Sequence, residues 1–185
     1  MSASSPQRRM LARLDDGAPA VFGDDPGAVE AAAAELRRRS RRLLRRSLHI
    51  RTVDTGSCGA CESEIRLLGA PHYDLHRLGL FLTPAPRHAD CLLVTGPGCR
   101  SMDHGLLAAY EAMPEPKLVV AVGACPLGGV LGEDQYTRGS LEGLVPVDVV
   151  IPGCPPSPLA LIQGLLVALD RLQERLPTVA PEATG

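Results

Sequence analysis

Four of the six cysteines are spaced in a way that could bind a metal centre. Cys58 and Cys61 form a C-x2-C pair, whereas Cys125 and Cys154 stand alone and are each followed by proline. Four thiolates can bind either Zn²⁺ or an iron–sulfur cluster. Structural zinc sites usually use two local pairs of ligands, and this chain has one. The spacing therefore favours an iron–sulfur cluster and keeps zinc as an alternative.

Other roles compete for these cysteines. The C-x2-C pair could be a redox-active dithiol of the thioredoxin type. That interpretation leaves Cys125 and Cys154 unexplained, and the chain lacks the tryptophan that usually precedes such a motif. Cys91 lies within an apolar run and is expected to be a small core residue. Cys99, in the turn TGPGC, is expected to be a bystander thiol, with a role as cluster neighbour or substitute ligand as the alternative.

Short apolar runs alternate with helical patterns from residue 48 onward. Continuous runs rich in Val, Ile and Leu are typical of strands buried in a parallel sheet. The carboxyl ends of parallel strands share one edge, where α/β proteins place their sites. The cysteine loops follow the first strand and the last two, so we expect their four thiols to converge at that edge. The pattern predicts a parallel α/β sheet, with strands at 48–54, 78–83, 89–96, 117–123 and 147–153 and helices at 62–70, 103–113 and 156–176.

Composition and charge exclude several classes of protein. Hydrophobic residues make up 45% of the 185 residues and tryptophan is absent, so we expect a core of Leu, Val, Ile and Ala. The net charge of −2 gives no bias toward nucleic acid. The chain has no run of about 18 apolar residues, so no membrane span is predicted, and no secretory signal is evident. A cytoplasmic, reducing setting is therefore expected, where cysteines are more often ligands than disulfides.

The chain divides by composition into four segments. Residues 1–27 lack periodicity and are expected to be a disordered tail, as are residues 177–185 at the other end. Residues 28–47 are rich in Ala, Leu, Glu and Arg and predict a basic helix. Its apolar residues are sparse, so we expect a solvated helix that is dispensable for metal binding. Docking to an acidic partner or an anionic lipid surface is the alternative. Residues 48–176 would then form the metal-binding α/β domain.

Four ordered motifs resemble one family of redox subunits. The motifs are VDTGSCGACESEI, PRHADCLLVTGP, VVAVGACPLGG and VPVDVVIPGCPPSP. Over about residues 48–172 they resemble the small subunit of membrane-bound, complex-I-related [NiFe] hydrogenases, and also the quinone-proximal iron–sulfur subunit of complex I. The resemblance implies a flavodoxin-like α/β fold and one [4Fe–4S] cluster bound by Cys58, Cys61, Cys125 and Cys154.

The resemblance also implies partners and further residues. The partners are a large subunit with a Ni–Fe centre or a quinone pocket, a ferredoxin-like cluster subunit and, indirectly, membrane subunits at the inner face of the cell membrane. Complex I subunits place the first two cluster cysteines adjacent, so the C-x2-C spacing favours the hydrogenase branch. By position, Glu64 matches an acid close to the cluster, and Arg87 and His88 match a basic pair. Glu62 is expected to be an exposed acid at a helix start.

We therefore expect an electron-transfer subunit of an oxidoreductase complex. It would pass electrons to or from a centre on a large subunit and catalyse no reaction alone. Hydrogen bonds to sulfur, burial and nearby charge would set the cluster potential. A quinone-proximal subunit is the alternative within the family. A zinc-stabilised structural or interaction module and a thiol oxidoreductase are the alternatives from other classes.

Overall fold

The computed structural model describes residues 26–175, except residues 78, 129–131 and 142. The predicted tails lie outside the described residues, apart from residues 26 and 27, which begin a helix. The elements are, in order, α2 (Pro26–Leu44), β1 (Leu48–Asp54), α3 (Ala60–Leu67), β2 (Leu80–Leu82), η1 (Pro86–His88), β3 (Cys91–Thr95), η2 (Arg100–Met102), α4 (Asp103–Ala112), β4 (Leu118–Val122), β5 (Val149–Ile151) and α5 (Pro158–Arg175).

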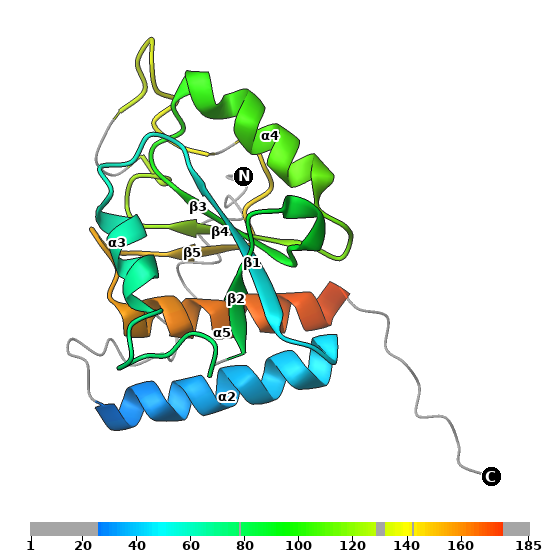
Figure 1. Ribbon diagram of the computed structural model, residues 1–185. Coiled ribbons are helices and arrows are strands. Elements are labelled where there is room, and N and C mark those ends of the chain that lie inside the picture. Colours follow the sequence, from blue (N-terminus) through cyan, green and yellow to red (C-terminus); the bar gives the residue numbers. More distant parts are fainter. Residues whose placement is uncertain (1–25, 78, 129–131, 142, 176–185) are drawn as a thin grey trace, which may run out of the picture.

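The strands of the described region form one parallel sheet in the order β2-β1-β3-β4-β5 (Figure 1). The register is continuous across the centre, where Val53 of β1 pairs with Val94 of β3, and Val94 pairs with Ala121 of β4. This order is that of flavodoxin-like α/β folds, so the predicted fold class is confirmed. Because the strands are parallel, their C-terminal ends all lie at one edge of the sheet, which we call the carboxyl edge. The cysteine loops follow β1, β4 and β5 at this edge.

Helices cover both faces of the sheet (Figure 1). Successive side chains of a strand point to opposite faces, so Ile50 joins the core beneath α2, α3 and α5, whereas Val53 joins the core beneath α4. Every residue of the central strands β3 and β4 is buried. This two-sided burial explains their continuous apolar runs. It also gives the loops at the carboxyl edge a rigid base.

The helix α2 packs against α5 on one face of the sheet (Figure 1). Val29, Ala33 and Leu36 are buried in the core that contains α5 and the strands. Their spacing places them along one stripe of the helix, and the small alanine lets the two helices approach closely. The basic helix is confirmed, but the expectation of a solvated helix is wrong for this face. Sparse apolar residues are enough here because Val29, Ala33 and Leu36 share the buried side of the helix.

Candidate metal centre

The C-x2-C pair lies in the loop between β1 and α3. The Asp54 carboxylate accepts hydrogen bonds from the N–H groups of Gly56 and Ser57, at 2.9 and 2.7 Å, which turns the chain at the end of the strand. Gly59 then adopts a φ of 85°, a left-handed conformation that suits glycine, directly before α3. This geometry leaves Cys58 exposed in the loop and buries Cys61 in the first turn of α3.

The other two candidate ligands follow β4 and β5. Backbone hydrogen bonding continues past the ends of these strands, because the N–H of Ala124 donates to the carbonyl of Gly153 at 2.8 Å. Cys125 and Cys154 come directly after these two residues. The bond therefore holds the two cysteine loops side by side, with Cys125 partly buried and Cys154 exposed.

Gly123 brings the β4 loop against the C-x2-C pair. Its φ is 95°, and a Cβ placed on it would lie 2.7 Å from the Sγ of Cys61. Such a contact is too short for a real side chain, so the backbone runs directly against this thiol. The three loops thus meet around Cys61, as the topology of a parallel sheet predicts.

Two of the four thiols have a raised pKa, and neighbouring thiols contribute to each shift. The pKa of Cys61 is raised to about 11, first by burial, then by the Glu62 carboxylate, and then by the thiols of Cys125, Cys58 and Cys154. Burial also raises the pKa of Cys125, and Cys154 and Cys58 raise it further. Thiols with a raised pKa stay protonated at neutral pH unless a positive centre stabilises the thiolates. A cationic centre bound here would therefore have to stabilise the thiolate forms of Cys61 and Cys125.

Glu62 lies closer to the thiols than its sequence position suggests. The hydroxyl of Thr95, at the end of β3, donates a hydrogen bond to Glu62 Oε1. Its Oε2 atom is buried and has no hydrogen-bond partner among the described residues. The expectation of an exposed helix-start acid is therefore wrong. Thr95 is the residue in the sequence that could have indicated this inward position of Glu62. It ends a neighbouring strand and therefore lies at the same edge of the sheet.

The structure does not bring the predicted basic pair to the cysteines. Arg87 and His88 are exposed in η1, which precedes β3. The five residues of β3 then run about 16 Å toward the carboxyl edge. The pair therefore lies near the amino ends of the strands, at the opposite edge of the sheet. Glu64, by contrast, is partly exposed on α3, one turn beyond Cys61.

The remaining two cysteines have different surroundings. Cys91 is fully buried in β3, as predicted for a core residue, and burial raises the pKa of its thiol. Cys99 lies beside the C-x2-C loop, where its N–H donates to the carbonyl of Thr55 at 2.8 Å. Its Sγ packs directly on Gly56, so that any side chain there would collide with it. The bystander role of Cys99 stays a prediction.

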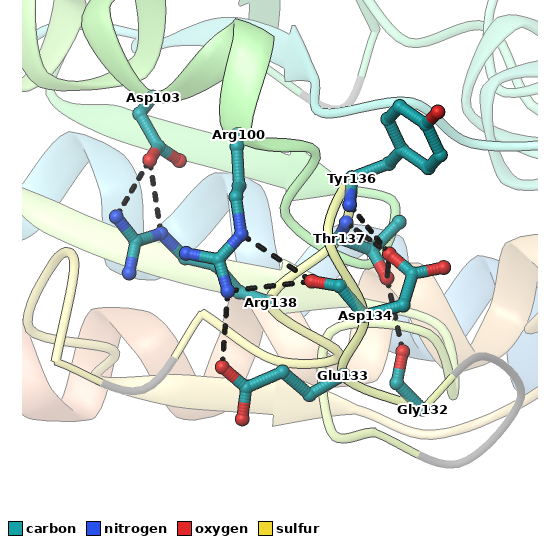
Figure 2. A network of polar contacts seen from close by, with 8 residues as sticks. All are labelled: Arg100, Asp103, Gly132, Glu133, Asp134, Tyr136, Thr137 and Arg138. Atoms are coloured by element: carbon teal, nitrogen blue, oxygen red, sulfur yellow. Dashed lines mark hydrogen bonds and ion pairs between the residues drawn. The ribbon is translucent and has the colours of Figure 1, made fainter.

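A polar network holds the segment 132–138 against the start of α4 (Figure 2). Arg138 donates two hydrogen bonds to the Asp103 carboxylate, at 2.9 and 2.7 Å. Arg100 of η2 donates to Glu133 at 3.0 Å. Asp103 is the first residue of α4 and Arg100 is the first residue of η2. These contacts therefore hold the segment 132–138, which follows Cys125 in the chain, at the carboxyl edge.

The same segment presents apolar surface beside the site. Asp134 closes its turn by accepting hydrogen bonds from the N–H groups of Tyr136 and Thr137, at 2.7 and 2.6 Å, which lowers the pKa of Asp134 (Figure 2). Thr137 forms a β-bridge with Cys99, so the segment lies along the cysteine loops. The side chains of Tyr136 and Met102 are 69% and 38% exposed. An exposed tyrosine held on a fixed turn suits contact with a partner protein.

The separation of the donors bears on the choice between zinc and a cluster. Among the described residues, no three His, Cys, Asp or Glu side chains are close enough to hold one metal ion. Zinc bound by four thiolates has bonds of about 2.3 Å, which brings the sulfurs within about 3.8 Å of one another. A cluster binds its thiolates through different irons, so its ligands lie further apart. A zinc ion and a cluster thus require different sulfur separations, and metal analysis distinguishes them.

Comparison with known proteins identifies relatives among redox complexes. The family described as NADH ubiquinone oxidoreductase, 20 kDa subunit, matches residues 58–168. The probable membrane-bound hydrogenase subunit mbhJ of Pyrococcus furiosus is 41% identical over 145 residues, which are 78% of this chain and 87% of that protein. Formate hydrogenlyase subunit 7 of Escherichia coli is 38% identical over 157 residues, which are 84% of this chain and 62% of that protein.

Two further relatives extend the comparison. An NADH-quinone oxidoreductase subunit of Geobacter metallireducens is 43% identical over 121 residues, which are 65% of this chain and 71% of that protein. A chain in the structure of the membrane-bound sulfane sulfur reductase, an archaeal respiratory membrane complex, superposes with a TM-score of 0.62 and 31% identity, covering 76% of this chain and 77% of that chain. None of the helices in the described residues is long and apolar enough to cross a membrane. The family match includes all four candidate cysteines, whereas α2 precedes it.

Proposed function

We propose, from the premise that the chain belongs to the family of the NADH ubiquinone oxidoreductase 20 kDa subunit, that it holds one [4Fe–4S] cluster and transfers electrons within a multisubunit oxidoreductase. The observation that supports this most directly is the approach of three cysteine loops: a Cβ on Gly123 would lie 2.7 Å from the Sγ of Cys61, and the N–H of Ala124, next to Cys125, donates to the carbonyl of Gly153, next to Cys154. Cys58, Cys61, Cys125 and Cys154 would each bind one iron of the cluster.

The residues at the carboxyl edge fit such a cluster. Once bound, it would supply a centre that accepts and returns a single electron. Gly123 lets the backbone lie against Cys61, which excludes water from that ligand. The partly buried Glu62 carboxylate places negative charge beside Cys61 and Cys125. That charge would favour the oxidised state and so lower the reduction potential.

The electron partner in this proposal is a large subunit of the hydrogenase type. Two observations favour this branch: the C-x2-C spacing, and the hydrogenase and formate hydrogenlyase relatives, which align with 78% and 84% of the chain. The NADH-quinone oxidoreductase relative aligns with 65%, so a quinone-site partner is the second candidate. A ferredoxin-like cluster subunit would pass electrons in, and membrane subunits would hold the complex at the cytoplasmic face of the membrane.

The cluster is tested by metal analysis and electron paramagnetic resonance of the full chain, purified without oxygen. We expect about four irons per chain and the signal of a reduced [4Fe–4S] cluster. Replacing any of the four candidate ligands with alanine should abolish that signal, whereas Cys99→Ala should keep it. Zinc at one equivalent without iron would contradict the proposal. So would iron loss in Cys99→Ala together with iron retention in Cys125→Ala.

The partner is tested by co-purification from the native host. A large subunit should accompany the chain, and nickel in that complex would assign the hydrogenase branch. A complex that contains iron and reduces quinone without nickel would assign the second candidate. A cluster-loaded chain that is stable alone and purifies without any large subunit would contradict the assignment to a complex.

A further inference from the structure

The face of α2 that is turned away from α5 is rich in arginine. Arg37 and Arg41 lie four residues apart and are exposed, and Arg38 and Arg42 are exposed beside them. Residues four apart lie on the same side of a helix. Because the opposite side of α2 is buried in the core, the helix has a fixed orientation and these side chains form a surface of the folded domain.

Not all of these arginines are neutralised within the protein. Arg38 and Arg77 each pair with a glutamate, at 2.6 and 2.9 Å. Arg37 and Arg41 make no ion pair or hydrogen bond with any residue that the structure describes. Each guanidinium has five N–H donors in a planar fork that matches the oxygens of a phosphate. Two such groups one helical turn apart are therefore available to an anion.

These arginines line one groove, which lies between α2 and the turn that carries Arg77. The groove has a volume of about 580 Å³. Small residues on α2 leave room in it, and it contains a single acidic side chain among the described residues that line it. The lining residues are Glu30, Ala33, Ala34, Arg37, Arg38, Arg41 and Arg77. Its charge is thus positive, and its size exceeds that of one phosphate group.

An apolar side chain continues this surface along the edge strand β2. The side chain of Arg37 lies beside Gly79, where a Cβ would be 3.8 Å from its Cγ, so the groove reaches the start of β2. The next side chains of that strand, Phe81 and Leu82, are 36% and 44% exposed. Successive strand residues point to opposite faces, so Leu82, which pairs with Ile50, lies on the α2 side of the sheet and Phe81 on the other side.

Aromatic contacts join β2 to a further arginine. The Phe81 ring lies 4.7 Å from the ring of His76 and 5.7 Å from that of His49. His49 in turn lies 2.9 Å from the guanidinium of Arg46. Because Leu48, Ile50 and Leu80 face α2, the rings of His49 and Phe81 lie on the opposite face of the sheet, and Arg46 is paired with Asp90 at 2.6 Å. These residues therefore do not extend the groove. We call the groove with the neighbouring Leu82 the arginine face; it consists of Arg37, Arg38, Arg41, Arg77 and Leu82.

We propose that the arginine face docks on an anionic lipid surface, with phosphate headgroups taken up by the groove. Seven arginines lie within residues 37–46, at the C-terminal end of α2 and directly after it. A dense cluster of this kind on a helix surface is typical of segments that bind anionic lipid headgroups. Leu82, exposed on the α2 side of the edge strand, would reach the boundary between headgroups and acyl chains. This docking does not depend on the cluster.

The test measures binding of the full-length chain to sedimenting vesicles. The double variant Arg37→Gln/Arg41→Gln should bind vesicles of phosphatidylglycerol and phosphatidylcholine about thirtyfold more weakly, since each arginine near an anionic surface strengthens binding about fivefold. The matched control Arg66→Gln/Arg171→Gln removes the same charge from α3 and α5 and should bind like the wild type. Circular dichroism should show that all three proteins unfold at similar temperatures.

Four results would overturn the proposal. One is equal binding to vesicles of phosphatidylcholine alone, and another is equal loss of binding in both double variants, which would indicate only a net-charge effect. A third is tight binding of inorganic phosphate without vesicle binding, which would assign a site for a free anion. The fourth is binding of poly-glutamate without vesicle binding, which would assign an acidic protein partner. Loss of the cluster in any ligand variant would leave vesicle binding unchanged.

Discussion

The carboxyl edge of the sheet and the buried face of α2 differ in how their residues are held together. At the edge, three loops converge because parallel strands all end on the same side, and glycine lets the loops touch. At α2, by contrast, Val29, Ala33 and Leu36 meet α5 by side-chain packing alone. The first arrangement follows from chain direction, whereas the second requires two complementary helix surfaces. The proposed cluster site therefore lies where topology determines position, and the arginine face lies where packing determines it.

The largest effect is expected where a loop backbone touches a candidate ligand. Gly123→Ala should abolish cluster binding, because its Cβ would lie 2.7 Å from the Sγ of Cys61 and its φ of 95° disfavours a side chain. Gly143→Ala is the control, since Gly143 has a φ of 78° but no atom near its Cβ. Iron content of the anaerobically purified proteins measures the difference. Equal iron in both variants would show that the contact with Cys61 is not needed.

The buried face of α2 should contribute strongly to stability. Leu36→Ala should lower the free energy of unfolding by about 2–5 kcal/mol, because Leu36 is fully buried and its removal leaves a cavity. The exposed neighbour Arg37→Ala should change it by at most about 0.5 kcal/mol. Urea unfolding followed by circular dichroism measures both. Deletion of residues 1–47 removes this buried face and should likewise destabilise the domain. That the segment is dispensable for cluster binding stays a prediction.

The burial of Cys61 should appear in its reactivity. Its pKa is raised from 9.0 to about 11, so at neutral pH the metal-free thiol should form about a hundredfold less thiolate than an ordinary cysteine. Alkylation by iodoacetamide, followed by mass spectrometry, should therefore be slow and should accelerate about tenfold per pH unit until about pH 11. A rate that levels off near pH 9 would contradict the buried position.

The smallest effect is expected from the ion pair between the two helices. Arg39 of α2 pairs with Asp170 of α5, and both side chains are partly exposed. Solvent screens such pairs, so a double-mutant cycle with Arg39→Gln and Asp170→Asn should give a coupling energy of about 0.2–1 kcal/mol. The coupling should decrease at high salt. A value comparable to the Leu36 effect would mean that charge, and not packing, holds α2 in place.

The parallel direction of the strands made the positions of the candidate cysteines predictable from the sequence. The apolar runs predicted each strand to within about two residues, and the rule that parallel strands end on one edge then placed Cys58, Cys61, Cys125 and Cys154 together. The same rule separates Arg87 and His88 from the cysteines, because these residues precede a strand. The expectation that this pair lies near the cluster came from motif position alone, which carries no information about the edge a residue occupies.

The sequence by itself determined the alternation of strands and helices, the parallel sheet and the four candidate ligands, because each depends on local periodicity or on the order of elements. Only the tertiary structure decided that α2 belongs to the core, that Glu62 turns inward to Thr95, and that the arginines of α2 form a groove with Arg77. The physical reason is that burial and charge compensation depend on partners distant in the chain. The few apolar residues of α2 are buried only because α5, which begins more than a hundred residues later, packs against them.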